Sequence, residues 1–142
     1  MRLVLAGKIR DQKYFEEKIK PHIDNKQISY VGEIGFSQKV KLYKNAKGLL
    51  FPTKWQEPFG LVAIEALACG TPVIAHKNGA LPEIIEHGKN GFLTGNVASM
   101  TSAIKKLDSI DRKYCRESVE KKFTVKKMIE DYASICHKLI KK

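Results

Sequence analysis

The sequence is poor in cysteine and in long apolar runs, and each shortage excludes a class of protein. Its three cysteines, Cys69, Cys115 and Cys136, are widely spaced and form no C-x-x-C pair. This spacing argues against a disulfide framework or a zinc site and favours a reducing compartment. No apolar run is long enough to span a bilayer, and the apolar stretch at the N-terminus is too short for a signal peptide. We therefore expect a cytoplasmic globular protein with one domain over residues 1–142.

Arginine is also scarce, although the chain carries a formal net charge of +11. Of the 26 basic residues 22 are lysine, and the arginines are Arg2, Arg10, Arg112 and Arg116. Arginine binds phosphates and base edges better than lysine does, and the lysines here are scattered without interleaved aromatic residues. The composition favours a solvated, lysine-rich surface and disfavours a nucleic-acid partner. A peripheral contact with an anionic membrane, at its inner face, stays open as an alternative.

Short strand-like runs alternate with helical patterns along the chain. Strands are predicted at residues 3–6, 27–31, 48–51, 72–75 and 91–94, and helices at 11–20, 37–46, 60–69, 80–88, 97–107, 112–123 and 124–141. This order predicts an α/β fold with a Rossmann-like, doubly wound parallel sheet, three α/β/α layers, about five strands and C-terminal helices. In such sheets a ligand lies at the carboxyl ends of the strands, which here means the loops at 7–11, 32–36, 52–60 and 76–82.

The segment EPFGLVAIE, residues 57–65, combines two carboxylates with a helix that is apolar on every face. Such a helix is expected to be buried, and an ionised Glu65 within it needs a partner. Hydroxyl groups of a sugar or a ribose would satisfy it; a backbone group or a distant lysine is the alternative. Phe59 and Gly60 offer backbone N–H groups at the helix start, where a phosphate is favoured. Glu57 lies just outside the helix and can accept hydrogen bonds from sugar hydroxyls.

The same segment resembles a signature of the retaining GT-B glycosyltransferases of family 4, in their C-terminal, nucleotide-sugar-binding half. The E-x7-E signature stands here as Glu57 to Glu65, followed in family order by ALACGTPVIA at 66–75, GALPEII at 79–85 and HGKNGFL at 87–93. The resemblance covers nearly the whole chain. It implies transfer of a hexose from a nucleotide-diphosphate sugar with retention of the anomeric configuration, without a bound metal or cofactor.

By this resemblance, Glu57 would contact hydroxyls of the donor sugar and is the candidate catalytic residue. Glu65 would bind the ribose hydroxyls, and the backbone at Phe59, Gly60 and Leu61 would face the diphosphate or the sugar. Gly79, which opens the GALPEII motif, completes the expected donor-binding set.

Four further residues are weaker donor-binding candidates. Lys8 and Arg10 follow the first strand and either reach phosphate or lie in a solvated turn. Ala80 stands where many members of the family have a second glycine. Glu83 either caps a short helix or lies near the donor.

The chain departs from the family at its N-terminus. The first βα unit, with an Arg and a Lys that clamp the diphosphate in relatives, and the N-terminal acceptor domain are expected to be absent, so the isolated chain is expected to be inactive. The terminal helix 124–141 would then lack part of its cover, which predicts self-association. The alternatives are a non-catalytic nucleotide-sugar-binding module and a GT-B epimerase or phosphorylase. A nicotinamide-dependent dehydrogenase is disfavoured, because GKIRDQ rather than G-x-G-x-x-G follows the first strand.

Overall fold

The computed structural model describes residues 1–140, and the chain divides into two compact units. The first unit comprises Met1–Lys39, and the second, which begins at Val40, holds the remaining described residues. Each contains its own parallel sheet. The prediction of one donor-binding domain over residues 1–142 stays a prediction.

The first unit is one βαβ crossover. Its strands β1 (Leu3–Leu5) and β2 (Ile28–Tyr30) pair in parallel, with Leu3 opposite Ile28. The connecting helical segment changes type twice, from α1 (Gln12–Tyr14) through the π-helical η1 (Phe15–Ile19) to the 3₁₀-helical η2 (Lys20–His22). The expectation that a helix over 11–20 stops before Pro21 is therefore wrong. Pro21 lies in the first turn of η2, where a helix does not need the N–H group that proline lacks.

The second unit is built on a three-stranded parallel sheet in the order β3-β4-β5. Its strands are β3 (Leu49–Phe51), β4 (Val73–His76) and β5 (Gly91–Thr94). The central strand is the most deeply buried, because Val73, Ile74 and Ala75 are fully shielded from solvent. A strand buried on both faces has the continuous apolar sequence that β4 shows.

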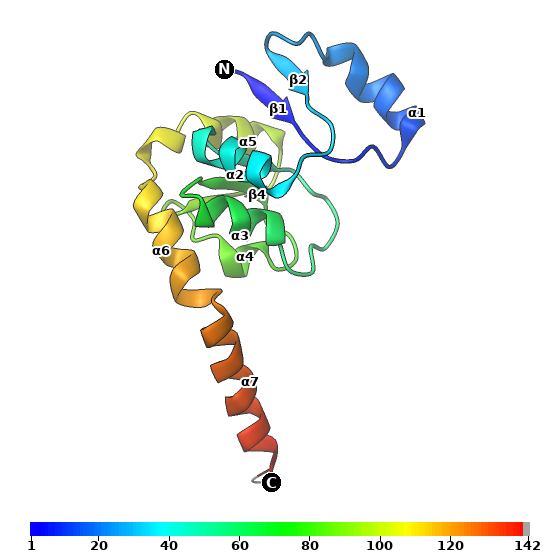
Figure 1. Cartoon of the computed structure of the whole chain (residues 1–142). Coiled ribbons are helices and arrows are strands. Elements are labelled where there is room, and N and C mark those ends of the chain that lie inside the picture. The colour runs from blue at the N-terminus through cyan, green and yellow to red at the C-terminus, as the bar shows by residue number, and fades with distance from the viewer. Residues whose placement is uncertain (141–142) are drawn as a thin grey trace. The chain divides into compact units, whose positions relative to one another are not determined.

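Helices cover both faces of this sheet. The helix α3 (Leu61–Ala68) contacts β3 and β4, whereas α5 (Val97–Ile104) contacts β4 and β5 from the opposite face (Figure 1). The other helices of this unit are α2 (Phe36–Asn45, which starts in the first unit), α4 (Leu81–Ile84), η3 (Leu107–Ser109), α6 (Arg112–Lys122) and α7 (Val125–Ile140). Five parallel strands flanked by helices confirm the predicted Rossmann-like α/β class, although the strands pair as two sheets rather than one.

The helix α4 is shorter than the predicted 80–88, because the side chain of Asn90 ends it. The side-chain nitrogen (Nδ2) of Asn90 donates to the carbonyl oxygen of Ile84 at 3.1 Å, and its side-chain oxygen accepts from the backbone N–H of Glu86 at 2.8 Å. Asn90 is fully buried and also bonds the hydroxyl of Ser118 on α6 at 3.1 Å. Residues 85–88 are therefore held as a loop whose backbone is satisfied by a side chain.

The helix α3 is not buried all round, which corrects the expectation from its composition. Ala63, Ala66 and Leu67 form its buried stripe at spacings of three and four residues, while Leu61 and Val62 are 63% and 41% exposed. The helix contacts the sheet and α6. Its first turn stays open to solvent.

The helix α7 has an exposed apolar stripe, as its pattern predicts. None of its described residues is buried, and Met128, Ile129, Tyr132 and Ile135 are among its exposed apolar side chains. Residue 141 of the predicted helix lies outside the described residues. Self-association through this stripe stays a prediction.

Candidate functional site

The carboxyl ends of β3, β4 and β5 bring three loops to one edge of the sheet. Phe51 pairs with Ala75 at the end of β3, and His76 pairs with Thr94 at the end of β5. The loop at 52–60, the turn at 77–80 and residues 95–96 therefore start side by side. This edge is where a parallel sheet places its ligand.

Glu57 holds the loop at 52–60 together. One of its carboxylate oxygens accepts a hydrogen bond from the backbone N–H of Gly60 at 3.0 Å, and the other lies 3.4 Å from the indole nitrogen of Trp55. The first contact corrects the expectation that the N–H group of Gly60 is free for a phosphate: a carboxylate three residues earlier occupies it. The N–H groups of Leu61 and Val62, in the first turn of α3, have no partner within the helix and stay open to a ligand.

The backbone of Glu57 is tied to the turn after β4. Its carbonyl oxygen accepts a hydrogen bond from the N–H of Ala80 at 2.8 Å, and the side chain of Gln56 accepts one from the N–H of Gly79 at 2.9 Å. The structure therefore brings the predicted residues Glu57, Gly60, Gly79 and Ala80 together. Gln56 was not among the predicted residues, and no motif in the sequence singles it out.

Gly79 is required by this close approach. It has a φ of +53°, and a β-carbon at this position would lie 2.8 Å from the carbonyl carbon of Glu57 and closer still to its carbonyl oxygen and amide nitrogen. Any side chain at position 79 would therefore force the two loops apart. Ala80 occupies an ordinary right-handed conformation with φ of −74°, so it needs no second glycine.

Glu65 lies half-buried on α3 and has a protein partner in the hydroxyl of Tyr43 on α2. Burial, the neighbouring charges of Glu65 and Cys69, and the hydrogen bond to Glu65 raise the pKa of Tyr43 to about 12. The sequence predicted that Glu65 needs a partner but did not identify Tyr43 as that partner. A carboxylate has enough acceptor positions to bind a tyrosine and ligand hydroxyls together.

The loop at 52–60 and the start of α3 carry exposed apolar side chains. Trp55 and Phe59 are 67% and 53% exposed, and Leu61 in the first turn of α3 is also exposed. The ring of Phe59 meets that of Phe123 edge to face, with 6.4 Å between the ring centres. Glu83 lies exposed in the first turn of α4, where its negative charge interacts favourably with the positive end of the helix dipole.

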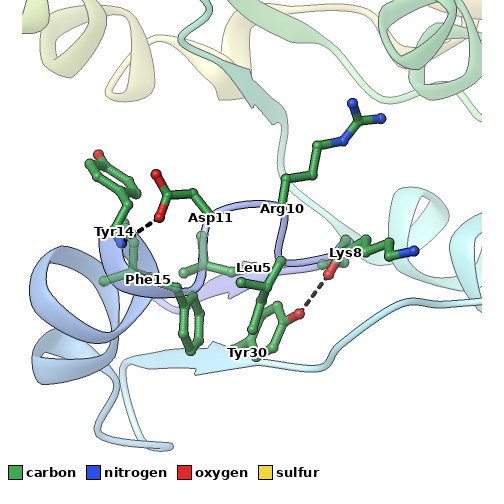
Figure 2. A pocket seen from close by; sticks show the side chains of 11 residues that line it. Leu5, Lys8, Arg10, Asp11, Tyr14, Phe15 and Tyr30 are labelled. Atoms are coloured by element: carbon green, nitrogen blue, oxygen red, sulfur yellow. Dashed lines mark hydrogen bonds between the residues drawn. The ribbon is translucent and has the colours of Figure 1, made fainter.

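Lys8 and Arg10 lie in the first unit, at a pocket of about 390 Å³ (Figure 2). Its floor is aromatic, because the rings of Phe15 and Tyr30 pack with centres 5.0 Å apart, and the hydroxyl of Tyr30 donates to the carbonyl oxygen of Gly7 at 2.6 Å. Figure 2 shows the charged ends of Lys8 and Arg10 extending away from the two rings. Both side chains are therefore free to reach an anion outside this pocket.

The described residues offer neither a metal-binding cluster nor a membrane-spanning helix. Residues 1–140 contain no group of three or more His, Cys, Asp or Glu side chains arranged to hold a metal ion. Within the same residues, no helix combines the length and the apolar character that crossing a membrane requires.

The fold matches those of glycosyltransferases of the GT-B class. AviGT4, a glycosyltransferase involved in avilamycin A biosynthesis, superposes with a TM-score of 0.78 at 26% identity, over 97% of this chain and 43% of that one. The HepE protein of Anabaena, solved in complex with UDP, superposes with a TM-score of 0.79 at 22% identity, over 97% of this chain and 41% of that one. The chain therefore has the fold of a GT-B glycosyltransferase domain.

The family follows from the sequence profile of glycosyl transferases group 1, which matches residues 1–122. The chain belongs to this family. It is 36% identical over 110 residues to a probable sucrose-phosphate synthase of Thermosipho melanesiensis, which covers 72% of this chain and 26% of that protein. It is 38% identical over 91 residues to a glycosyltransferase of unknown specificity from Methanocaldococcus jannaschii, covering 64% of this chain and 23% of that protein. The chain thus spans about a quarter of the length of these relatives.

Proposed function

We propose that the chain is the donor-binding domain of a retaining family 4 glycosyltransferase, which takes a hexose from a nucleoside diphosphate sugar. The observation that carries this proposal is the tie between the Glu57 loop and the Gly79–Ala80 turn, beside the open first turn of α3. Two backbone segments meet there with a glycine at their contact, which holds the Glu57 loop beside the open N–H groups of Leu61 and Val62.

The two glutamates are placed for the two ends of such a donor. Glu57 precedes α3, and Glu65 is its fifth residue, roughly 6 Å along the helix axis from Leu61 at 1.5 Å per residue. In the proposed complex Glu57 binds hydroxyls of the sugar and Glu65 those of the ribose. The diphosphate lies between them, against the N–H groups of the first helical turn.

The proposed reaction breaks the bond between the anomeric carbon and the diphosphate oxygen and forms a bond from the same face to an acceptor oxygen. Main-chain N–H groups at the start of α3 stabilise the charge that develops on the leaving diphosphate. A further domain, which would supply the acceptor site, closes over the donor in the proposed enzyme. The proposed site uses no resident metal, so chelation by EDTA should leave donor binding unchanged.

The donor is tested first with uridine nucleotides, because HepE was also solved with UDP-glucose. Calorimetry on this chain would compare UDP-glucose with UDP in three variants: Glu57→Gln, Glu65→Gln and the control Glu130→Gln on exposed α7. We expect Glu57→Gln to weaken UDP-glucose and spare UDP, because the remaining amide oxygen can still accept from the N–H of Gly60 while the charge that binds the sugar hydroxyls is lost. Glu65→Gln should weaken both ligands, each by about tenfold, as loss of a charge-assisted hydrogen bond predicts. Equal affinities in all three variants would refute the assignment.

The whole protein is proposed to act in the cytoplasm, and its lysine-rich surface allows a peripheral membrane contact. Co-sedimentation with vesicles of anionic lipid, compared with neutral vesicles, tests this contact. Binding to the anionic vesicles that disappears at high salt is the result expected of an electrostatic attraction.

A further inference from the structure

A second polar pocket lies where β4 and β5 end, and none of its lining residues belongs to the E-x7-E motif. It has a volume of about 460 Å³, within the range of small-molecule sites, about 300–1,000 Å³. The polar side chains that line it belong to Lys54, His76, Lys77, Asn78, Thr94 and Asn96. They all lie in the second unit, which makes the pocket a property of that unit alone.

The charge of this pocket is positive and uncompensated. Neither Lys54 nor Lys77 forms an ion pair with any residue in the described part of the chain, and no Asp or Glu side chain lines the pocket. Elsewhere exposed lysines do find carboxylates, as Lys47 does with Asp108 at 2.9 Å. Two unpaired ammonium groups at one concave site favour an anion.

The wall between the two strand ends is held in place by hydrogen bonds. The N–H of Lys77 donates to the carbonyl oxygen of Thr94 at 3.0 Å, and the N–H of Asn78 donates to that of His76 at 2.9 Å. The hydroxyl of Thr94 donates to the carbonyl oxygen of Ala75 at 3.0 Å. A wall that is ordered before the ligand arrives loses little entropy on binding.

His76 and the start of α5 add further groups suited to an anion. The Nδ1 atom of His76 lies 3.4 Å from the carbonyl oxygen of Thr94; with the proton on Nδ1, the lone pair of Nε2 can accept a hydrogen bond from a protonated phosphate oxygen. Asn96 caps α5 by accepting a hydrogen bond from the N–H of Ser99 at 2.9 Å. The helix therefore directs the positive end of its dipole toward this side of the pocket.

We propose that this pocket binds a phosphate group, at a subsite of the same sheet edge that lies beside the E-x7-E residues proposed for the donor. A sugar or a base would be expected to meet carboxylates or an aromatic ring other than histidine, and the lining offers neither. The pocket adjoins the Gly79 turn through Lys77 and Asn78, so the phosphate belongs to a molecule that meets the donor, a phosphorylated acceptor, or arrives as free phosphate. The assignment to an acceptor rests on the proposed function, whereas the phosphate site itself does not.

The test is a titration of the ¹⁵N-labelled chain with inorganic phosphate and, separately, with glucose 6-phosphate, at constant ionic strength. Backbone amide shifts report binding residue by residue. The variant Lys54→Gln/Lys77→Gln removes both pocket charges. The matched control is Lys105→Gln/Lys106→Gln, which removes two exposed lysines at the opposite end of α5. Amide spectra of both variants also show whether the fold is retained.

We expect shifts concentrated at residues 76–78 and 94–97, with a Kd at least about tenfold higher in the pocket variant and unchanged in the control. Tighter binding of glucose 6-phosphate than of phosphate indicates a phosphorylated acceptor, and equal affinities indicate free phosphate; either result confirms the site. Shifts elsewhere, or equal weakening in both variants, overturn the proposal. Displacement of phosphate by UDP also overturns it, because the pocket would then belong to the donor. UDP-glucose binding that responds to Glu65→Gln keeps the proposed function intact in each case.

Discussion

The contact between Gly79 and Glu57 can be tested by adding a single methyl group. In Gly79→Ala that methyl would lie 2.8 Å from the carbonyl carbon of Glu57, too close for two unbonded carbons, so one loop must move. The position also has a φ of +53°, which costs an alanine about 1–2 kcal/mol. Overpacking against a backbone adds about 1–3 kcal/mol.

Gly88 provides a matched control in the same unit. It has a φ of +81°, yet a methyl there meets nothing within 4 Å, so Gly88→Ala carries the conformational cost without the overpacking. The free energy of unfolding should therefore fall by about 1–3 kcal/mol more in Gly79→Ala than in Gly88→Ala. Urea unfolding followed by circular dichroism measures this difference.

A second readout separates stability from the site. Binding of UDP-glucose should be lost in Gly79→Ala and retained in Gly88→Ala, because only the first substitution displaces the loop that carries Glu57. Equal stability of the two variants would refute the close approach. Equal donor binding would refute the role of the Gly79 turn in the site.

Three further predictions concern the second unit. Hydrogen bonds from Lys122 and Tyr114 lower the pKa of Glu86 to about 2, so its stabilisation is present above about pH 5 and is lost as the pH falls toward 2. Between about pH 5 and pH 2 the free energy of unfolding should therefore fall by about 1 kcal/mol less in Glu86→Gln than in the native sequence, after allowance for solvent screening. An unchanged fall would count against the hydrogen bonds from Lys122 and Tyr114. Asn90→Ala should cost about 3 kcal/mol in urea unfolding, because it leaves buried partners unsatisfied; a cost below 1 kcal/mol would contradict this. Replacing Ile135 with lysine on exposed α7 should reduce self-association, measured by sedimentation velocity, without lowering the melting temperature. An unchanged distribution of sedimentation coefficients would show that the apolar stripe of α7 does not cause self-association.

The order of strands and helices could be predicted because each β-branched or apolar run is short and bounded by a turn residue. All five strands end within one residue of their prediction, and the central strand β4 is the most deeply buried of them. The pairing of the strands as two sheets depends on contacts between segments far apart in the sequence, and periodicity carries no such information.

The ends of helices were harder to predict, because tertiary contacts decide them. The side chain of Asn90 ends α4, and a turn of π-helix lengthens the segment after α1 before Pro21. Neither depends on the intrinsic propensity of the residues involved. A buried asparagine two residues after a glycine is compatible with many other turns.

The candidate site was predicted as a set of residues but not as a network. The structure brings Glu57, Gly60, Gly79 and Ala80 together, as the order of the motifs implied. It also gives Glu65 a protein partner in Tyr43, which lies 22 positions earlier on another helix. Local spacing cannot reveal a pair of that kind.

Ligand-observed NMR would show whether the edge of this sheet binds a nucleotide sugar. Saturation transfer from the chain to UDP-, GDP- and ADP-glucose would be recorded for the native sequence, for Glu65→Gln and for the control Glu130→Gln. We expect transfer to the ribose protons of one of these nucleotides, lost in Glu65→Gln and retained in Glu130→Gln. Transfer that is unchanged in Glu65→Gln, or no transfer from any donor to a folded chain, would contradict it.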